Sequence, residues 1–171
     1  MFAIVMLLIA LPLPVAAQDL LEVNLIALLD EPRGYCVDMI GYKERARTDR
    51  ALHAHTCYSY RGSIAVDQGI DRKLVREGRI RFPYFEVCMM IGQARAGEPL
   101  VLDKCTDSPS QRFRFTAAGE IQPDADLGLC VTIADGSGAE GGGGQPVHLL
   151  RPLSLEPCSK KAASRQRWQL R

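Results

Sequence analysis

The sequence predicts an all-β domain assembled from three copies of one short unit, and two observations predict it. The six cysteines form three successive pairs, and each pair encloses an apolar-x-apolar triplet and precedes a Gln-x-apolar motif. Short alternating runs bounded by Gly, Pro and Asp recur, as in residues 79–82, 98–102, 119–122 and 145–150. Such regular short strands are typical of β-sandwiches and barrels. Because no single unit could bury its apolar face alone, we expect the three to pack around a pseudo-threefold axis.

The units open at Cys36, Cys88 and Cys130 and share one order of motifs. Their triplets are Leu52-His53-Ala54, Leu100-Val101-Leu102 and Val147-His148-Leu149, and their closing motifs are Gln68-Gly69-Ile70, Gln111-Arg112-Phe113 and Gln166-Arg167-Trp168. The second cysteines are Cys57, Cys105 and Cys158, so the repeat singles out the disulfides Cys36–Cys57, Cys88–Cys105 and Cys130–Cys158. Alternation along a strand places Leu52, Leu100 and Val147 in the core and the middle residue of each triplet outside it. We also expect Ile70, Phe113 and Trp168 to be buried.

The segments around these motifs carry weaker signals. Residues 20–29 are apolar enough for a helix, but their place before the first cysteine favours a strand near residues 24–28. Residues 43–50 are rich in charge and predict a solvated loop. The glycines at 141–144 predict a flexible turn, and no Lys-Ser/Thr follows them to make a phosphate-binding loop.

The N-terminal residues predict export. Residues 2–11 are an unbroken apolar run, and Val15-Ala16-Ala17 offers a small-residue cleavage site, so residues 1–17 are interpreted as a secretory signal peptide. No Lys or Arg precedes the run, which leaves an uncleaved N-terminal anchor as the alternative. Residues 18–171 then form one domain without a further membrane span, secreted or periplasmic, where disulfides persist.

Charge and motif content argue against several functions. The net charge of +1 predicts no strong affinity for nucleic acid or for acidic membranes. The chain has no Gly-x-Ser-x-Gly or His-Glu-x-x-His motif, so we expect neither an enzyme nor a cofactor. The run His53-x-His55-x-Cys57 would place three zinc-type ligands on one strand face, but the repeat assigns Cys57 to a disulfide, so no metal site is expected.

These motifs resemble the β-trefoil repeats of the R-type, or ricin B-chain-like, lectins. The similarity rests on the opening Cys36-Val37-Asp38, on residues 144–149 and on the ending Gln166-Arg167-Trp168. It implies a β-trefoil of twelve strands with three pseudo-repeats and three intra-repeat disulfides, covering roughly residues 24–171. In that family an Asp after the opening Cys accepts hydrogen bonds from vicinal sugar hydroxyls, and an aromatic ring, an Asn and a Gln complete the site. A carboxylate and a flat ring suit these tasks because sugars present paired hydroxyls and apolar C–H faces.

The resemblance assigns candidate site residues unit by unit. The acidic position is Asp38, Met90 and Thr132 in the three units, and the Gln position is His53, Val101 and His148. The second unit has therefore lost both polar groups. The first-unit candidates for carbohydrate binding are Asp38, Tyr42, Arg50 and His53, and the weaker third-unit candidates are Thr132, Asp135, Gln145 and His148. The family's Asn has no counterpart, because the only Asn is Asn24.

The sequence thus predicts an exported, non-catalytic, lectin-like module that binds a glycan or glycoconjugate. Simpler interpretations stay open: Asp38 could accept backbone N–H groups in a turn, and His53 and His148 could be surface residues without a ligand. The main alternative is a degenerate β-trefoil that binds protein, as an inhibitor or interaction domain, through loops such as residues 43–50 or 72–79. An accessory to a separately encoded enzyme is a third possibility.

Overall fold

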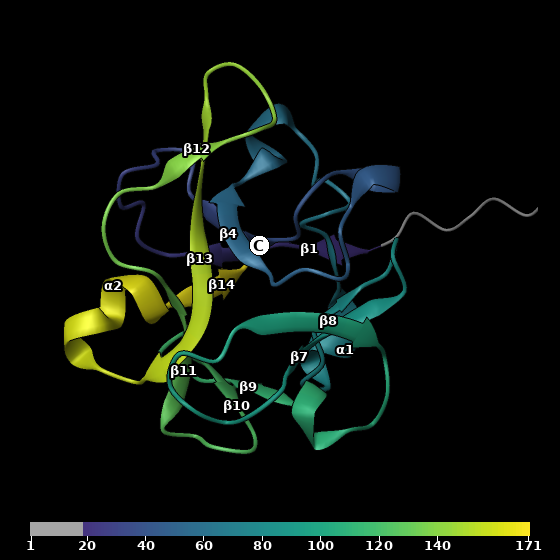
Figure 1. Ribbon diagram of the computed structural model, residues 1–171, viewed down its shortest axis with the longest axis vertical. Coiled ribbons are helices and arrows are strands. Elements are labelled where there is room, and N and C mark those ends of the chain that lie inside the picture. Colours follow the sequence, from purple (N-terminus) through teal and green to yellow (C-terminus); the bar gives the residue numbers. More distant parts are fainter. Residues whose placement is uncertain (1–18) are drawn as a thin grey trace, which may run out of the picture.

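The computed structural model describes residues 19–171, and in it the three units surround a common centre (Figure 1). The predicted signal peptide, residues 1–17, lies outside the described residues. Within residues 19–171 no helix is both long and apolar enough to cross a membrane.

Twelve strands carry the repeat, four in each unit. The first unit holds β2 (Val23–Leu25), β3 (Tyr35–Asp38), β4 (His53–Thr56) and β5 (Ile70–Asp71). The second holds β6 (Arg81–Phe82), β7 (Val87–Ile91), β8 (Leu100–Lys104) and β9 (Phe113–Phe115). The third holds β10 (Ile121–Pro123), β11 (Leu129–Ile133), β13 (His148–Pro157) and β14 (Trp168–Leu170). The predicted strand at residues 24–28 is real but shorter, and it begins one residue earlier, at Val23.

Two further strands and six short helices complete the described chain. β1 (Leu20–Leu21) pairs with β5, and β12 (Ala139–Gly141) pairs with the start of β13. The α-helices are α1 (Arg72–Arg76) and α2 (Ala163–Gln166), and the 3-10 helices are η1 (Lys43–Arg45), η2 (Tyr58–Arg61), η3 (Pro109–Gln111) and η4 (Lys160–Ala162). The charged segment 43–50 is an exposed loop, as expected, and contains η1.

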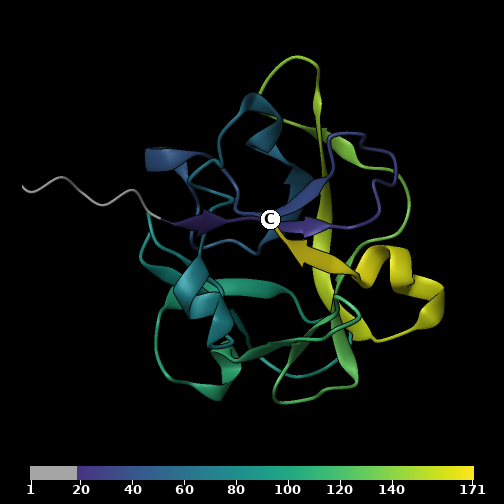
Figure 2. The ribbon, with the colours of Figure 1, turned by 180° about the vertical axis from the view of Figure 1, so that it is seen from behind.

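The units are joined through their edges. β14 pairs antiparallel with β2, so the last strand of the chain lies beside the first unit, as seen from behind in Figure 2. β9 pairs with β10 and so joins the second unit to the third, and β4 pairs with β13. Pairing of this kind leaves few unprotected strand edges. The result is the β-trefoil that the resemblance predicts.

The three predicted disulfides are all present. They join Cys36 to Cys57, Cys88 to Cys105 and Cys130 to Cys158, with Cα–Cα distances of 5.0, 4.9 and 5.1 Å. The described cysteines include no free thiol. Because each bridge closes a loop inside one unit, each constrains the unfolded chain locally.

The predicted core is mostly confirmed. Leu52 and Leu100 are buried, and so are Ile70, Phe113 and Trp168. The Trp168 indole also donates a hydrogen bond from Nε1 to the carbonyl of Val131, at 2.9 Å, so its polar atom is satisfied inside the core.

The glutamines of the closing motifs form the same backbone bonds in each unit. Gln68, Gln111 and Gln166 each accept a backbone N–H from the residue after the second cysteine, at 2.9, 2.7 and 2.9 Å. Each also donates from Nε2 to the carbonyl of the residue before that cysteine, at 3.0, 2.8 and 3.0 Å. All three are buried, so the Gln of the motif ties the disulfide loop to the core.

In the third unit the predicted triplet is wrong. Strand pairing aligns Thr132 with Ser154, as it aligns Asp38 with His53 and Met90 with Val101. The third triplet is therefore Leu153-Ser154-Leu155, and both leucines are buried. Val147, expected in the core, is 36% exposed, and His148, expected to point outward, is 0% exposed.

The reason is an extra hairpin. β12 and the first residues of β13 extend the third unit beyond its counterparts, which moves the triplet six residues along the chain. A signal for this shift exists in the sequence: Leu52, Leu100 and Leu153 each precede their second cysteine by five residues, whereas Val147 does not.

Candidate functional site

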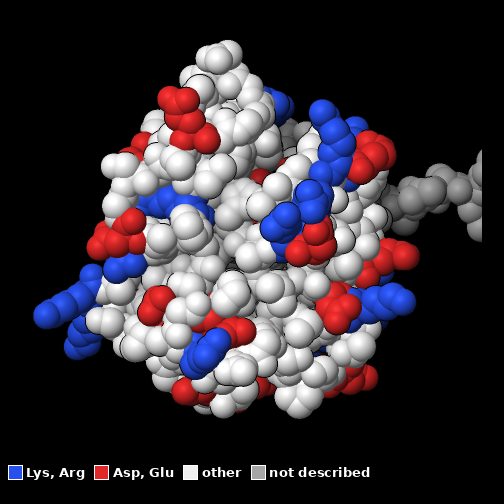
Figure 3. All heavy atoms as spheres, viewed as in Figure 1, with Lys and Arg blue, Asp and Glu red and all other residues white. Residues whose placement is uncertain are grey.

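A large cavity lies on the first unit. Its volume is about 1040 Å³, and strands β3, β4 and β13 contribute its floor. Three segments wall it: the η1 loop, the η2 helix with the residues that follow it, and the glycine turn between β12 and β13. Figure 3 shows a hollow on this face, between uncharged surface and a group of Lys and Arg side chains. A cavity of this size is sufficient for a small-molecule ligand.

Asp38 and His53 lie side by side on the floor. They are directly paired across β3 and β4, so their side chains project from the same face of the sheet. Asp38 is 2% exposed and accepts a hydrogen bond from Gln68 Nε2 at 2.8 Å through Oδ2. Its other oxygen, Oδ1, has no hydrogen-bond partner, and neither has Nδ1 of His53. Unsatisfied buried polar atoms are rare and costly, so a hydrogen-bonding group brought against this pair would be stabilising.

The surroundings of Asp38 disfavour its charge. Burial, followed by the nearby Asp67 carboxylate, raises the pKa of Asp38 well above its usual range. Burial also raises the pKa of Asp67 to about 6, and its Oδ1 is likewise without a partner. Two buried carboxylates in one place repel each other when both ionise. A bound ligand that donates hydrogen bonds to Asp38 would relieve part of this cost.

Histidine and tyrosine rings form a cluster beside the floor. The His55 ring stacks on Tyr58 at 5.3 Å and meets His148 edge-on at 5.2 Å, between ring centroids. Tyr60 Oη lies 3.0 Å from Nε2 of His148. Burial lowers the pKa of His53 and of His148 to about 4, so both rings are neutral at pH 7. Their neutral form adds no positive charge beside Asp38.

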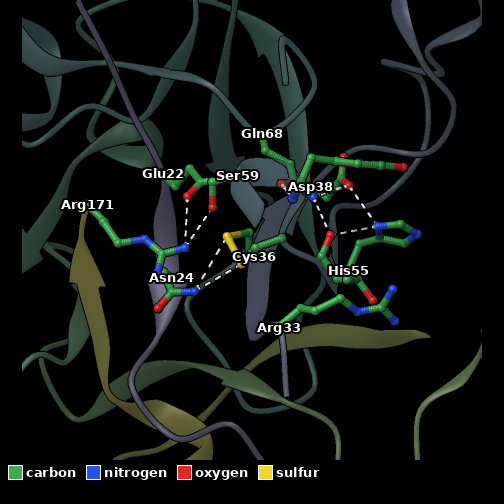
Figure 4. Close-up of a disulfide and its surroundings, with 12 residues drawn as sticks. Glu22, Asn24, Arg33, Cys36, Asp38, His55, Ser59, Gln68 and Arg171 are labelled. Carbon is green, nitrogen blue, oxygen red and sulfur yellow. Dashed lines mark hydrogen bonds and ion pairs between the residues drawn. A yellow bond between two sulfur atoms is a disulfide. The ribbon is translucent and has the colours of Figure 1, made fainter. Parts of the chain in front are cut away.

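His55 connects this cluster to the carboxylate. Its Nδ1 lies 3.5 Å from Oδ2 of Asp38 and 3.1 Å from the carbonyl of Thr56, and its Nε2 lies 3.1 Å from the carbonyl of Gly142. Figure 4 shows Asp38, Gln68 and His55 converging next to the disulfide of Cys36. The Cys36–Cys57 bridge therefore anchors the strands that carry the site.

The glycine turn of the third unit covers one side of this site. Arg61 Nη2 donates to the carbonyl of Gly143 at 2.8 Å, and Arg33 donates to the carbonyls of Pro146 and Val147, at 3.1 and 2.6 Å. Gly143 has φ of 121°, and a Cβ there would lie 2.6 Å from the Tyr58 hydroxyl. Only glycine allows the backbone to approach the rings so closely.

The structure brings most of the predicted first-unit residues together in the cavity. Asp38, Tyr42 and His53 all line the cavity. Arg50 does not: it is exposed on the outer side of its loop, where its Nε lies 3.8 Å from Asp49.

The third-unit predictions are not brought together. Thr132 is buried, accepts from Gln166 Nε2 at 3.0 Å and donates to the carbonyl of Cys130 at 2.8 Å, which leaves its hydroxyl satisfied. Asp135 is exposed near Arg165, and Gln145 is exposed in the glycine turn. His148 belongs to the ring cluster of the first unit instead.

Three groups at the site are missing from the sequence-based set. His55 shares a strand face with His53, two residues away, which is a signal in the sequence. Asp67 directly precedes the closing Gln68, and Tyr58 directly follows the second cysteine. Nothing local distinguishes these two as site residues, because only the fold brings η2 and residue 67 over β4.

The described part of the chain offers no obvious metal centre. In residues 19–171 no three His, Cys, Asp or Glu side chains are placed to hold an ion. Cys57 is bonded to Cys36, so it cannot act with His53 and His55 as a thiolate ligand.

Two solved structures are similar to the chain. The solution structure of the mdaA-1 domain has a TM-score of 0.62 and 14% identity, with 90% of each chain covered. The β-trefoil lectin of the Vibrio vulnificus hemolysin/cytolysin, solved with N-acetyl-D-lactosamine bound, has a TM-score of 0.53 and 15% identity. That match covers 89% of this chain and 94% of the other. At such identities the likeness shows the fold alone.

Sequence comparison gives the family. No protein with a curated description matches the chain. The profile of the ricin-type β-trefoil lectin domain matches residues 76–171, which hold nearly all of the second and third units. The cavity lies mainly on the first unit, outside the matched residues. Since the match covers more than half of the sequence, the chain belongs to the ricin-type β-trefoil lectin domain family.

Proposed function

We propose that this protein is an exported, non-catalytic carbohydrate-binding domain whose single site is the cavity of the first unit. The observation that carries the proposal is the pair of unpartnered atoms on its floor, Asp38 Oδ1 and His53 Nδ1. A polar side chain buried in a core is normally satisfied, so a lining that leaves two such atoms free favours a ligand rich in hydrogen-bonding groups.

The chemistry of the floor suits vicinal hydroxyls. The Oδ1 oxygen of Asp38 can accept a hydrogen bond from a hydroxyl, while Oδ2 remains held by Gln68. Neutral His53 offers one ring nitrogen as donor or acceptor, next to that carboxylate. Because Gln68 fixes the carboxylate and strand pairing fixes both backbones, the two groups are pre-arranged for adjacent hydroxyls.

The other units support a single site. Met90 stands where Asp38 stands, and Val101 where His53 stands, so the second unit has no polar pair. In the third unit Thr132 is already bonded at both ends and faces Ser154. Export fits the three disulfides, which persist in oxidising compartments, and fits the predicted signal peptide.

A glycan panel tests the proposal. The oxidised protein, the variant Asp38→Asn and the matched control Asp135→Asn are applied to an immobilised glycan array that includes N-acetyl-D-lactosamine. We expect wild type and Asp135→Asn to bind the same glycans and Asp38→Asn to bind none. Equal binding by wild type and Asp38→Asn would remove the site from the first unit. No binding by wild type to a broad panel would contradict carbohydrate recognition and favour the protein-interaction alternative.

A further inference from the structure

We propose that the ligand of the first-unit cavity is a glycoside with an apolar aglycone, such as an alkyl or aryl group, rather than a free sugar. This inference rests on the proposed function and adds a second contact region to the site. The sugar ring would meet Asp38 and His53 on the floor, and the aglycone would lie along the apolar wall toward the rim.

The first argument is size. The cavity of about 1040 Å³ is at the upper end of the range that holds drug-sized ligands, which are several times larger than one sugar ring. A single hexose on the floor would leave most of the cavity volume to water. A ligand with a second group fills that volume.

The second argument is the separation of polar and apolar lining. The polar pair on the floor is small, and aliphatic side chains of β13 and of the surrounding segments line much of the remaining cavity, beside the rings of Tyr42 and Tyr58 and the basic side chains of the wall. These aliphatic residues are Met39, Ile40, Ile64, Val66, Leu150 and Pro152. Aliphatic side chains provide neither hydrogen bonds for hydroxyls nor flat aromatic faces for a sugar ring. They do favour a hydrocarbon group, because its burial removes apolar surface from water.

The third argument is the rim. Ile40 is 46% exposed and Tyr42 is 44% exposed, although both line the cavity. The apolar lining therefore extends to the solvent-exposed side chains of Ile40 and Tyr42 at the rim. Basic side chains border it, as in Lys43, whose Nζ lies over the Tyr42 ring at 5.1 Å from the centroid, in a cation–π contact.

Paired glycosides test this inference. Calorimetry measures the affinity for methyl and octyl β-glycosides of galactose, glucose, mannose and N-acetylglucosamine, with the octyl compounds below their micelle-forming concentration. 1-Octanol is the probe without a sugar. The variants are Asp38→Asn for the floor, Ile40→Ser for the rim, and Leu28→Ser as a matched control, because Leu28 is similarly exposed but does not line the cavity.

We expect the octyl glycoside of the recognised sugar to bind at least about tenfold more tightly than its methyl counterpart, the effect of burying roughly two methylenes. Ile40→Ser should reduce this ratio and leave the affinity for the methyl glycoside unchanged. Leu28→Ser should change neither the ratio nor the methyl-glycoside affinity. Asp38→Asn should abolish binding of both the methyl and the octyl glycoside. Equal affinities for methyl and octyl compounds would overturn the apolar subsite but leave the proposed sugar site intact. Octanol binding as tightly as the octyl glycosides, or no binding of any probe, would overturn the proposed function as well.

Discussion

Gln68 donates a hydrogen bond from Nε2 to Asp38 at 2.8 Å, and its counterpart Gln166 donates to Thr132 at 3.0 Å. In the first and third units, the glutamine that ties the disulfide loop to the core thus also orients the residue at the acidic position. In the first unit that residue keeps a free carboxylate oxygen, whereas in the third unit the hydroxyl is satisfied. The same fold-stabilising bond therefore supports a candidate site in only one of these two units.

Asp38→Asn should separate stability from binding. Asn keeps an amide oxygen that can accept from Gln68, but it removes a buried charge that lies beside Asp67. We expect the variant to lose glycan binding and to have a higher free energy of unfolding than wild type at pH 7, because it removes a charge that burial and the neighbouring Asp67 disfavour. Urea unfolding at pH 7 measures the gain, with Asp135→Asn as an exposed control. A lower stability for Asp38→Asn would show that burying this carboxylate carries no cost.

The pH dependence of stability should contain opposing contributions from buried histidines and buried carboxyl groups, for which His53 and Asp67 are the test cases. The pKa of His53 is lowered to about 4 in the folded protein. Between pH 6.5 and 4 the unfolded chain therefore binds a proton that the folded protein does not, and the free energy of unfolding decreases as the pH falls. The pKa of Asp67 is raised to about 6, so between pH 6 and 3.8 the fold binds the extra proton, and stability rises as pH falls.

Variants can resolve these contributions. Between pH 6.5 and 5, His53→Asn should lose less stability than wild type on acidification, and Asp67→Asn should lose more. Urea unfolding at several pH values in this window gives the slopes. Identical slopes for all three proteins would contradict both the lowered pKa of His53 and the raised pKa of Asp67.

Trp168→Ala should destabilise the fold strongly. The indole is fully buried in the core and donates a hydrogen bond to the Val131 carbonyl, so its removal leaves both a cavity and an unsatisfied acceptor. We expect a loss of about 3–5 kcal/mol in the free energy of unfolding. Trp168→Phe is the matched variant and should lose less, because it retains most of the ring. Equal stability of Trp168→Ala and wild type would be incompatible with a shared core.

The disulfide of the third unit should matter to stability more than to binding. The double variant Cys130→Ala/Cys158→Ala opens a loop whose two cysteines do not line the cavity, and we expect it to lose about 2–4 kcal/mol in the free energy of unfolding while retaining glycan affinity. Removal of Cys36 and Cys57 should reduce both the stability and the glycan affinity, because this disulfide holds β3 and β4, which carry Asp38 and His53. Denaturation and calorimetry of the two double variants provide the comparison.

The fold was largely predictable because the repeat is a local pattern. Cysteine pairs and closing motifs recur in order, and their pairing and burial follow from that order. The third triplet could not be predicted from this order, because the extra hairpin of β12 places another apolar triplet, which begins at Val147, before the true one, which begins at Leu153. An insertion of this kind changes the register without changing the motifs.

The candidate site was only half predictable. Asp38 and His53 lie at motif positions, and their pairing across two strands follows from the repeat. The cavity around them depends on segments that are distant in sequence, because a turn of the third unit reaches Tyr58 of the first. Arg50 illustrates the limit: proximity in sequence to the site placed it in the set, but its side chain points to solvent and Asp49.

The most direct test of sugar recognition in the first unit is NMR mapping. Backbone and histidine-ring shifts of the oxidised protein are followed during titration with the glycan that binds best on the array, to millimolar concentration, where a single shallow site worth about −4 kcal/mol begins to fill. We predict that the shifts concentrate at Asp38, His53 and the neighbouring cavity residues, and that they vanish in Asp38→Asn. Shifts confined to the third unit around Asp135, or shifts that persist in Asp38→Asn, would contradict the account.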